Sequence, residues 1–188
     1  MARATRIRCF VAVDIDAPDV VSRIRALQED LLRTEARVKL VEPQNLHITL
    51  AFIGEVPPVL VERAKDALSR IHYKSFTIKL EGMGAFPSLM RPRVIWIGVH
   101  EGAALLTDLA SLVRRELKRA GVPFDPKDFV PHLTLARVKG SNPTLTAWLR
   151  RLEAVEAGEI TVDKVKLKKS RLTHHGPIYE TLYEKPLE

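Results

Sequence analysis

The chain has 188 residues, of which 46% are hydrophobic, so it can form one domain with a substantial core or two small lobes. Its 30 Lys and Arg against 23 Asp and Glu give a net charge of +7, which indicates an anionic partner, most commonly nucleic acid. The single cysteine, Cys9, excludes an internal disulfide and a cysteine-based zinc site. Because no stretch has the roughly 18 apolar residues of a membrane span and the N-terminus lacks a signal-peptide pattern, we expect a soluble, cytoplasmic protein.

Hydrophobic periodicity predicts alternating strands and helices along the first half of the chain. The nearly continuous apolar run at 7–15 predicts a strand, and apolar residues at helical spacing predict a helix at 18–33. Gly54 is expected to end a later strand, and the glycine- and proline-bearing segment 82–93 to connect two others. The further elements expected in this half are strands at 38–41, 46–53, 76–80 and 94–99 and a helix at 58–71.

The second half is expected to contain two helices, a strand and a closing hairpin. The helix at 103–120 should end at Gly121 and bury four leucines, Leu105, Leu109, Leu112 and Leu117. The other elements expected are a strand at 130–138, a helix at 143–154, and strands at 160–172 and 178–183 around the turn HHGP. Helices separated by pairs of strands, with several loops too short for crossovers, indicate an α+β fold of antiparallel sheets with helices on their outer faces.

Two of the predicted strands carry the same polar motif. In NLHITLAF, large apolar residues alternate with His47 and Thr49, so the apolar residues should face a core and the two polar ones the opposite side. The segment VPHLTLAR repeats this arrangement 85 residues later with His132 and Thr134. The recurrence indicates an internal duplication, in which residues 1–188 form one two-lobed domain and each lobe offers one H-x-T-x element to a central cleft.

Two histidines and two threonines suit the cleavage of a phosphodiester by in-line displacement. One imidazole can accept a proton from the attacking oxygen and the other can donate one to the leaving oxygen, since histidine titrates at about pH 6.5. The threonine hydroxyls can donate hydrogen bonds to the non-bridging phosphate oxygens, where negative charge accumulates. Ala51 and Ala136, expected on the same faces, leave room for a substrate. This scheme needs no metal and no other cofactor.

Other chemistries have less support. Zinc needs three or four ligands, and the two motifs supply only two histidines, with no carboxylate or thiolate beside them. The sequence has neither a G-x-S-x-G nucleophile elbow nor the glycine spacing of a dinucleotide- or phosphate-binding loop. The remaining histidines are interpreted as structural, capping or surface residues, namely His72, His100, His174 and His175.

Basic residues lie where the flanking phosphates of a nucleic acid would bind. Strand parity places Arg137 on the face opposite His132, unless a β-bulge changes its direction. A stripe of alternate lysines near the C-terminus is either a further phosphate contact or a solvated outer face, and it comprises Lys164, Lys166 and Lys168. The residues expected to bind substrate are Arg137, Lys39, Phe52 and Arg93.

The paired elements HITL and HLTL resemble those of the two-histidine phosphoesterase superfamily. Within it, the chain is most similar to the bacterial and archaeal RNA 2′,3′-cyclic phosphodiesterases, historically called 2′-5′ RNA ligases. One H-x-T alone would carry little weight, whereas an ordered set of similar segments along nearly the whole chain is a specific match. These segments are RCFVAVDI, VEPQNLHITLAFIGEV, GAFPSLMRPRVIWIGV, FVPHLTLARVK and KSRLTHHGPIYETLYEKPL.

The resemblance implies a bilobal α+β fold with a positively charged central cleft and hydrolysis of RNA 2′,3′-cyclic phosphate ends to 2′-phosphomonoesters. It also implies that His47 is the proton donor to the leaving 3′-oxygen and His132 the proton acceptor that activates water, while Thr49 and Thr134 bind the phosphate. The two motifs are nearly symmetric, so the residues by themselves leave the histidine roles interchangeable. We expect a monomer whose partners are RNAs with 2′,3′-cyclic phosphate ends, such as tRNA fragments.

Two alternatives to hydrolysis stay open. The same active site could join a 2′,3′-cyclic phosphate end to a 5′-hydroxyl as a 2′-5′ RNA ligase, because both directions pass through the same transition state. A non-catalytic RNA-binding module would use only the basic cleft. Such a module has no need of paired acid–base groups, which both motifs retain.

Overall fold

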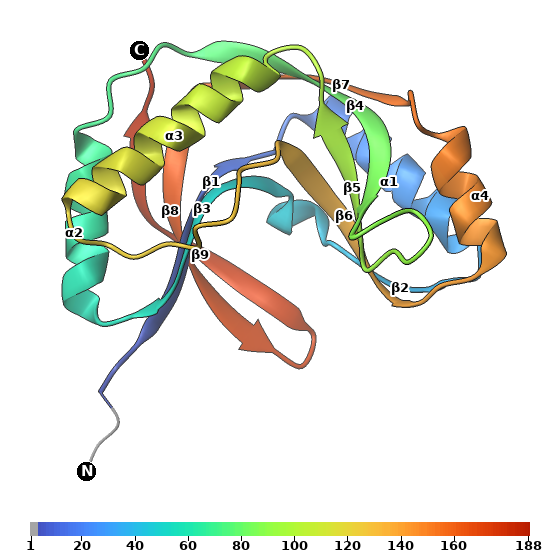
Figure 1. The fold of residues 1–188 in the computed structure, drawn as a ribbon, viewed down its shortest axis with the longest axis horizontal. Helices are drawn as coiled ribbons and strands as arrows, with labels where there is room; N and C mark the ends of the chain where they lie inside the picture. The colour runs from blue at the N-terminus through green and yellow to red at the C-terminus, as the bar shows by residue number, and fades with distance from the viewer. Residues whose placement is uncertain (1–3) are drawn as a thin grey trace.

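The computed structural model describes residues 4–188, which form nine strands and four α-helices (Figure 1). The strands are β1 Ile7–Asp14, β2 Arg37–Leu40, β3 His47–Val56, β4 Phe76–Phe86, β5 Val94–Val99, β6 His132–Gly140, β7 Glu156–Val162, β8 Lys164–Thr173 and β9 Gly176–Pro186. The helices are α1 Pro18–Leu32, α2 Pro58–Ser69, α3 Ala103–Arg119 and α4 Pro143–Arg151, with a short 3₁₀ helix, η1, at Pro43–Asn45. No helix in the described part is long and apolar enough to cross a membrane.

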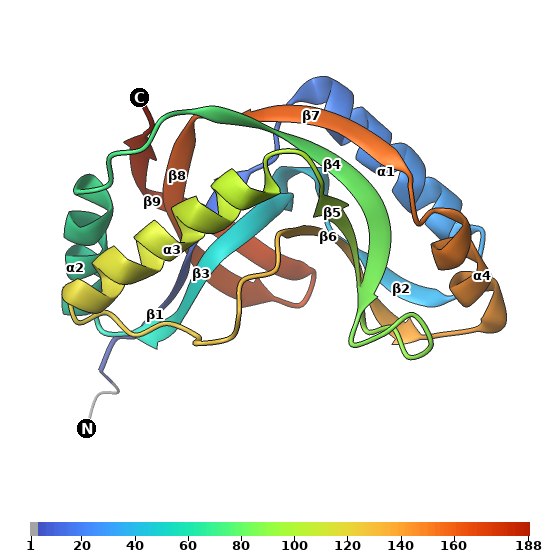
Figure 2. The same ribbon diagram turned by 45° about the horizontal axis from the view of Figure 1, so that its top comes forward.

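The strands form two antiparallel sheets. The first sheet has the order β3-β1-β8-β9 and the second the order β2-β6-β5-β4-β7. Figures 1 and 2 show α2 and α3 beside the first sheet and α1 and α4 on the opposite side of the molecule, beside the second. The predicted α+β class, with two antiparallel sheets and outer helices, is confirmed. The first histidine motif lies on the first sheet and the second motif on the second.

Helix α3 buries a different face from the one expected. Leu105 is 47% exposed, whereas its neighbour Leu106 is fully buried, since the apolar face of the helix lies one residue further along. Leu109 and Leu117 are buried as predicted. Gly121, with a φ of +70°, follows the last helical turn in the left-handed conformation that glycine favours at this position.

Two stretches of the chain form longer or shorter strands than expected. β4 continues through residues 82–86 because this stretch pairs with β5, and the indole of Trp96 fills the space where a Cβ of Gly84 would lie. The expected strand at 160–172 is broken at Asp163, where the chain passes from β7 in the second sheet to β8 in the first. β8 and β9 then form the predicted closing hairpin.

A β-bulge interrupts the alternation of β3. The register to β1 shifts between Thr49 and Ala51, so Leu50 is the extra residue. The bulge turns Ala51 into the core, where it is fully buried, and brings Phe52 onto the face that carries His47. The expectation that Ala51 leaves room beside the motif is therefore wrong, as is the expectation that Phe52 faces the core. A second register shift lets β3 continue past Gly54 to Val56.

β6 contains the equivalent bulge. Its register to β5 shifts between Thr134 and Ala136, so Leu135 is the extra residue. Ala136 is fully buried and does not leave room for a substrate either. Arg137 pairs with Val94 and thus lies on the same face as His132, so the placement of Arg137 by simple strand parity is wrong.

Candidate active site

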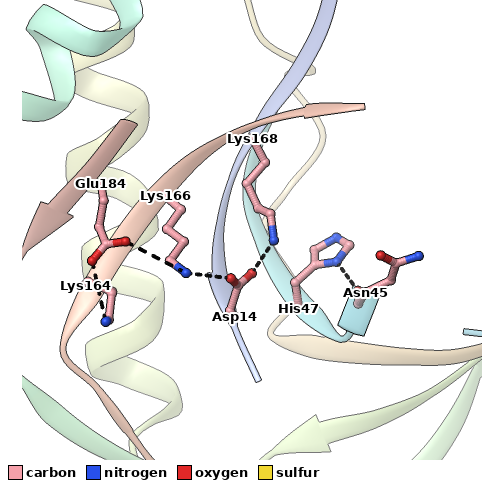
Figure 3. A network of polar contacts seen from close by, with 7 residues as sticks. All are labelled: Asp14, Asn45, His47, Lys164, Lys166, Lys168 and Glu184. Carbon is pink, nitrogen blue, oxygen red and sulfur yellow. Dashed lines mark hydrogen bonds and ion pairs between the residues drawn. The ribbon is translucent and has the colours of Figure 1, made fainter. Parts of the chain in front are cut away.

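His47 is the first residue of β3 and is oriented by its own strand. Its Nδ1 lies 2.7 Å from the carbonyl oxygen of Asn45 (Figure 3), and its Nε2 lies 3.1 Å from Oγ1 of Thr49. Because a carbonyl oxygen can only accept, Nδ1 carries the hydrogen. The Nε2 of the neutral ring is then a lone pair beside the Thr49 hydroxyl, which is the atom available for proton transfer.

His132 is the first residue of β6 and has the same orientation. Its Nδ1 lies 2.6 Å from the carbonyl oxygen of Val130, again two residues back along the chain. Its Nε2 is therefore also the unprotonated nitrogen of the neutral ring. A charge on His132 lowers the pKa of His47, so the two rings are near enough to interact. Thr134 shares the face of His132.

The surroundings of both imidazoles disfavour the charged form. Burial is the largest cause that lowers the pKa of His47 to about 4; the Asn45 carbonyl opposes it and the Lys168 ammonium adds to it. Burial also lowers the pKa of His132, against the opposing effect of the Val130 carbonyl. Both rings are thus neutral at neutral pH in the ligand-free site, and the negative charge of a bound phosphate would raise both pKa values.

Aromatic side chains pack against each imidazole. His47 lies 4.9 Å from Phe10 and 5.2 Å from Tyr179, measured between ring centroids. His132 lies 5.0 Å from Phe86 and 6.2 Å from Trp96. These contacts restrict both rings and keep water from one side of each, which is the physical origin of their lowered pKa values.

A carboxylate and two lysines form an ionic network beside His47 (Figure 3). Asp14 Oδ1 accepts a hydrogen bond of 2.6 Å from Lys168, and Oδ2 one of 2.9 Å from Lys166. Burial raises the pKa of Asp14, but the two lysine hydrogen bonds outweigh it, so the net effect is a lowered pKa. Lys168 is only 5% exposed, and a solvated outer face is therefore excluded for it. Lys164 pairs with Glu184 at 3.5 Å, further along the same strand.

Two of the predicted binding residues lie together on the second sheet. Lys39 is paired with Arg137 across β2 and β6, so both side chains share the face of His132. The Lys39 ammonium reaches the β8–β9 turn, where a Cβ added to Gly176 would lie 3.4 Å from its Nζ. Arg137 is close enough to Tyr179 to lower the pKa of that phenol, although burial dominates and the net effect is a raised pKa. The hairpin of the first sheet thus meets the basic edge of the second.

The other two predicted binding residues differ in their placement. Phe52 lies on the face of His47, and the Arg8 guanidinium stacks 4.8 Å from its ring centroid. Arg93 is exposed just before β5 and is joined to neighbouring segments through its backbone. The binding roles of all four residues stay predictions. The four histidines interpreted as surface or structural residues are all exposed, and they are His72, His100, His174 and His175.

Sequence reasoning missed several residues of the site. Asp14 ends the apolar run of β1 and lies directly opposite His47, and Phe10 shares its face. The alternation within β1 contains this signal, but it becomes useful only when the pairing of β1 with β3 is known. Tyr179 and Trp96 belong to strands distant in sequence from the motif that each contacts. Within residues 4–188, no three His, Cys, Asp or Glu side chains are grouped as metal ligands.

Two facing antiparallel sheets, each presenting a histidine and a threonine to one site, define the class of two-histidine phosphoesterases. The family model described as LigT-like phosphoesterase matches residues 13–96 and again residues 97–179. The chain belongs to this family and is an enzyme that acts on phosphate esters. Each matched segment contains one H-x-T element.

Curated relatives and solved structures agree with this assignment. The chain is 42% identical over 167 residues to an RNA 2′,3′-cyclic phosphodiesterase of Aeropyrum pernix, covering 88% of this chain and 95% of that protein. It is 43% identical over 175 residues to one of Archaeoglobus fulgidus, covering 93% and 97%. The crystal structure of E. coli LigT with 3′-AMP has a TM-score of 0.77 at 26% identity, covering 98% of this chain and 99% of that one.

Proposed function

We propose that the protein hydrolyses RNA 2′,3′-cyclic phosphate ends to 2′-phosphomonoesters by acid–base catalysis without a metal. The observation that carries this proposal is the matched presentation of two imidazole Nε2 atoms, one from each sheet, each on the same strand face as a threonine hydroxyl. The names of the curated relatives and the 3′-AMP bound by E. coli LigT support the substrate class. The RNAs concerned include tRNA fragments, and the protein acts as a cytoplasmic monomer.

The reaction is an in-line displacement at phosphorus. His132 accepts a proton from water, whose oxygen attacks the phosphorus, and the bond from phosphorus to the 3′-oxygen breaks. His47 donates its proton to that 3′-oxygen, so the product carries a 2′-phosphate and a free 3′-hydroxyl. Thr49 and Thr134 donate hydrogen bonds to the non-bridging oxygens, and Arg137 offsets their negative charge. No atom in this sequence of steps requires a metal ion.

The assignment of donor and acceptor depends on the bound phosphate. In the ligand-free site, burial and the Lys168 ammonium oppose a proton on His47, whereas the Asp14 carboxylate favours one. His47 therefore acts as the acid only if the substrate's negative charge raises its pKa before the chemical step. Proton donation by His47 is thus coupled to substrate binding.

The direct experiment is incubation of the protein with an RNA that ends in a 2′,3′-cyclic phosphate. We expect a 2′-phosphomonoester, identified by phosphorus nuclear magnetic resonance, and turnover reduced by roughly 10²–10⁴-fold in His47→Ala and in His132→Ala. The exposed His100→Ala variant is the control and should keep wild-type turnover. Near-native turnover of either motif variant would contradict the mechanism, and a 2′-5′ linked product formed from a 5′-hydroxyl RNA would favour the ligase.

The pH dependence of the same two variants assigns the roles. The wild-type rate should follow a bell whose limbs belong to the coupled histidine pair. Loss of the acidic limb in His132→Ala and of the basic limb in His47→Ala is expected if His132 is the base and His47 the acid. The reverse pattern would exchange the two roles.

Metal independence has a separate test. A preparation dialysed against excess chelator should hydrolyse the cyclic phosphate at an unchanged rate, because protons are moved by imidazoles and charge is offset by Arg137. Loss of activity that zinc or magnesium restores would instead indicate metal-assisted hydrolysis.

The single two-lobed domain with an internal duplication remains part of this proposal. Its support is the double family match and the equivalence of the two motif strands. β3 and β6 show the same order of half-buried and buried residues over their first five positions. Both have the bulge at the leucine that follows the threonine.

A further inference from the structure

The two β-bulges are each held by a side chain from a different helix. At the β3 bulge, the carbonyl oxygen of Leu50 accepts a hydrogen bond of 3.0 Å from Nε of Arg114 on α3. At the β6 bulge, the carbonyl oxygen of Leu135 accepts one of 3.0 Å from Nε2 of Gln28 on α1. A bulge leaves one residue of the ladder unpaired, so its backbone groups need partners from elsewhere. The two helices that supply these partners lie on opposite sides of the molecule (Figure 1).

Both amide hydrogens of Gln28 are used in hydrogen bonds at the β6 bulge and beside it. Its amide nitrogen also donates 2.8 Å to the carbonyl oxygen of Val41, and the Val41 amide donates 2.9 Å to the Leu135 oxygen. Both acceptor sites of the Leu135 oxygen and both amide hydrogens of Gln28 are therefore used. Gln28 is only 4% exposed. An apolar residue would fill this position on α1 without the cost of burying an amide, which indicates that the hydrogen bonds themselves are needed.

Arg114 has a broader set of partners at the β3 bulge. Besides Leu50, it donates 2.7 Å to the carbonyl oxygen of Lys127, and its guanidinium lies 5.9 Å from the ring centroid of Phe129. It thus ties the β3 bulge to the chain that leads into the second motif. That chain also pairs with β3 directly, through the Asp125 amide and the Phe52 carbonyl oxygen at 2.8 Å.

We propose that Gln28 and Arg114 are positioning residues that hold the two bulges and so bring Arg137 and Phe52 onto the faces of the catalytic histidines. Without its bulge, β6 would keep its period of two and present Arg137 on the face opposite His132. The same slip on β3 would turn Phe52 toward the core. The inference rests on the proposed function only in taking Arg137 and Phe52 as substrate contacts.

The decisive experiment is a double-mutant cycle between Gln28→Met and Arg137→Ala, with kcat and KM measured for an RNA 2′,3′-cyclic phosphate. Gln28→Met keeps the side-chain volume and removes the donor. We expect it to lower kcat/KM by roughly 10- to 100-fold in the wild-type background, the range for a misplaced binding group. In the Arg137→Ala background the further loss should be less than about 2-fold, because the group being positioned is already absent. Equal losses in both backgrounds, or near-native activity of Gln28→Met, would overturn the proposal.

Thr34→Val is the matched control for Gln28→Met. Thr34 is also buried just after α1 and bonds locally to Leu31 and Ala36, but it has no hydrogen bond to either bulge. Removal of the Thr34 hydroxyl should lower the melting temperature and leave kcat/KM within about 2-fold of wild type. A comparable activity loss in Thr34→Val would show that loss of stability alone explains Gln28→Met. If Gln28→Met is too unstable to purify, Gln28→Asn, which is too short to reach both carbonyl groups, takes its place in the same cycle.

The corresponding cycle for α3 pairs Arg114→Met with Phe52→Ala. Arg115→Met is the control, because the neighbouring Arg115 is exposed and its side chain pairs with Glu116, at 3.9 Å, instead of with a bulge carbonyl group. We expect Arg114→Met to lower kcat/KM less in the Phe52→Ala background than in wild type, and Arg115→Met to leave it unchanged. Full additivity of Arg114→Met and Phe52→Ala would overturn the role assigned to Arg114.

A structural measurement separates this proposal from the proposed function. The crystal structure of Gln28→Met is expected to show a changed register between β5 and β6 and Arg137 away from the face of His132. An unchanged bulge would overturn the inference even if the enzyme hydrolyses cyclic phosphates. If the bulge is altered in Gln28→Met but the wild-type protein does not hydrolyse cyclic phosphates, the inference is supported and the proposed substrate is wrong.

Discussion

The chemistry of single residues depends on charges that flank the motifs. His47 has a cation, Lys168, and an anion, Asp14, among the groups that determine its pKa, and burial adds to the effect of the cation. The Lys168 ammonium is hydrogen-bonded to Asp14 at 2.6 Å and lies 5.7 Å from the ring centroid of Tyr179, which itself packs on His47. Lys168 therefore acts on the imidazole at short range and out of water, where electrostatic effects are large.

Removal of Lys168 should raise the pKa of His47. In Lys168→Met the repelling cation is absent while the Asp14 carboxylate remains, so the remaining charge favours the imidazolium. We expect the His47 resonance, followed by nuclear magnetic resonance, to titrate at higher pH than in the wild type, where the pKa is about 4. Lys166→Met is the matched control, because Lys166 bonds the same carboxylate but is not among the main groups that shift the pKa of His47. Equal upward shifts in the two variants would assign the effect to Asp14 instead.

At the scale of elements, three strands of the second sheet cooperate to hold one imidazole. Gly84 on β4 lets the indole of Trp96 on β5 lie flat across the neighbouring strand. Trp96 packs 5.1 Å from Phe86, and both rings contact His132 on β6. The glycine in β4 thus determines the position of the aromatic wall formed by Trp96 and Phe86, and through this wall the position of the His132 ring.

Gly84→Ala should disturb this wall. A Cβ at this position overlaps three atoms of the Trp96 ring, and the flanking strands leave little freedom to move. We expect a loss of stability of about 1–3 kcal/mol, the usual cost of overpacking, together with lower turnover because His132 loses its support. Thermal unfolding and kcat are the measurements. Thr77→Ala, at an exposed position of the same strand, should change neither; wild-type turnover of Gly84→Ala would mean that the wall does not position His132.

At the scale of the whole molecule, the chain passes back and forth between the two sheets. The first sheet contains β1, β3 and the C-terminal hairpin of β8 and β9, and the second contains β2 and β4 to β7, which lie between these strands in the sequence. The site therefore forms only when both sheets are folded. The buried, neutral histidines at their junction link its chemistry to global stability, because unfolding exposes both rings to water.

Stability should fall as the pH drops from about 6.5 toward 4. The unfolded His47 has a pKa of 6.5 and the folded one about 4, so between these values the unfolded state binds more protons and gains from acidification. The His132 shift has the same sign. The lowered pKa of Asp14 stabilises the folded state, and this contribution is lost mainly as the pH falls below the ordinary aspartate pKa of 3.8.

The His47 contribution is bounded by its shift, at most about 3 kcal/mol over this window. Denaturant unfolding at several pH values measures it, and His47→Gln should flatten the dependence because the position no longer titrates. His100→Gln, at an exposed site, should leave the slope unchanged. A wild-type free energy of unfolding that stays constant between pH 6.5 and 4 would contradict the buried neutral state.

The sequence by itself determined the class of fold and the location of the two motifs within it. Strands, helices and the H-x-T pairs are local patterns, because periodicity and side-chain type are properties of neighbouring residues. The resemblance to the family rested on these same segments, and the family match confirms it. Helix α3 buries Leu106 in place of the expected Leu105, because the two leucines compete for one buried position and only the neighbouring strands decide between them.

Only the tertiary structure decided which residues accompany the motifs. The direction of Phe52 and Arg137 depends on the two bulges, where Arg114 and Gln28, more than sixty residues away, bond to the extra carbonyl groups. Asp14 and Lys168 meet because β8 pairs with β1 across more than a hundred and fifty residues. Contacts of this kind are set by strand pairing and packing between distant segments, and a period read along one strand contains no information about them.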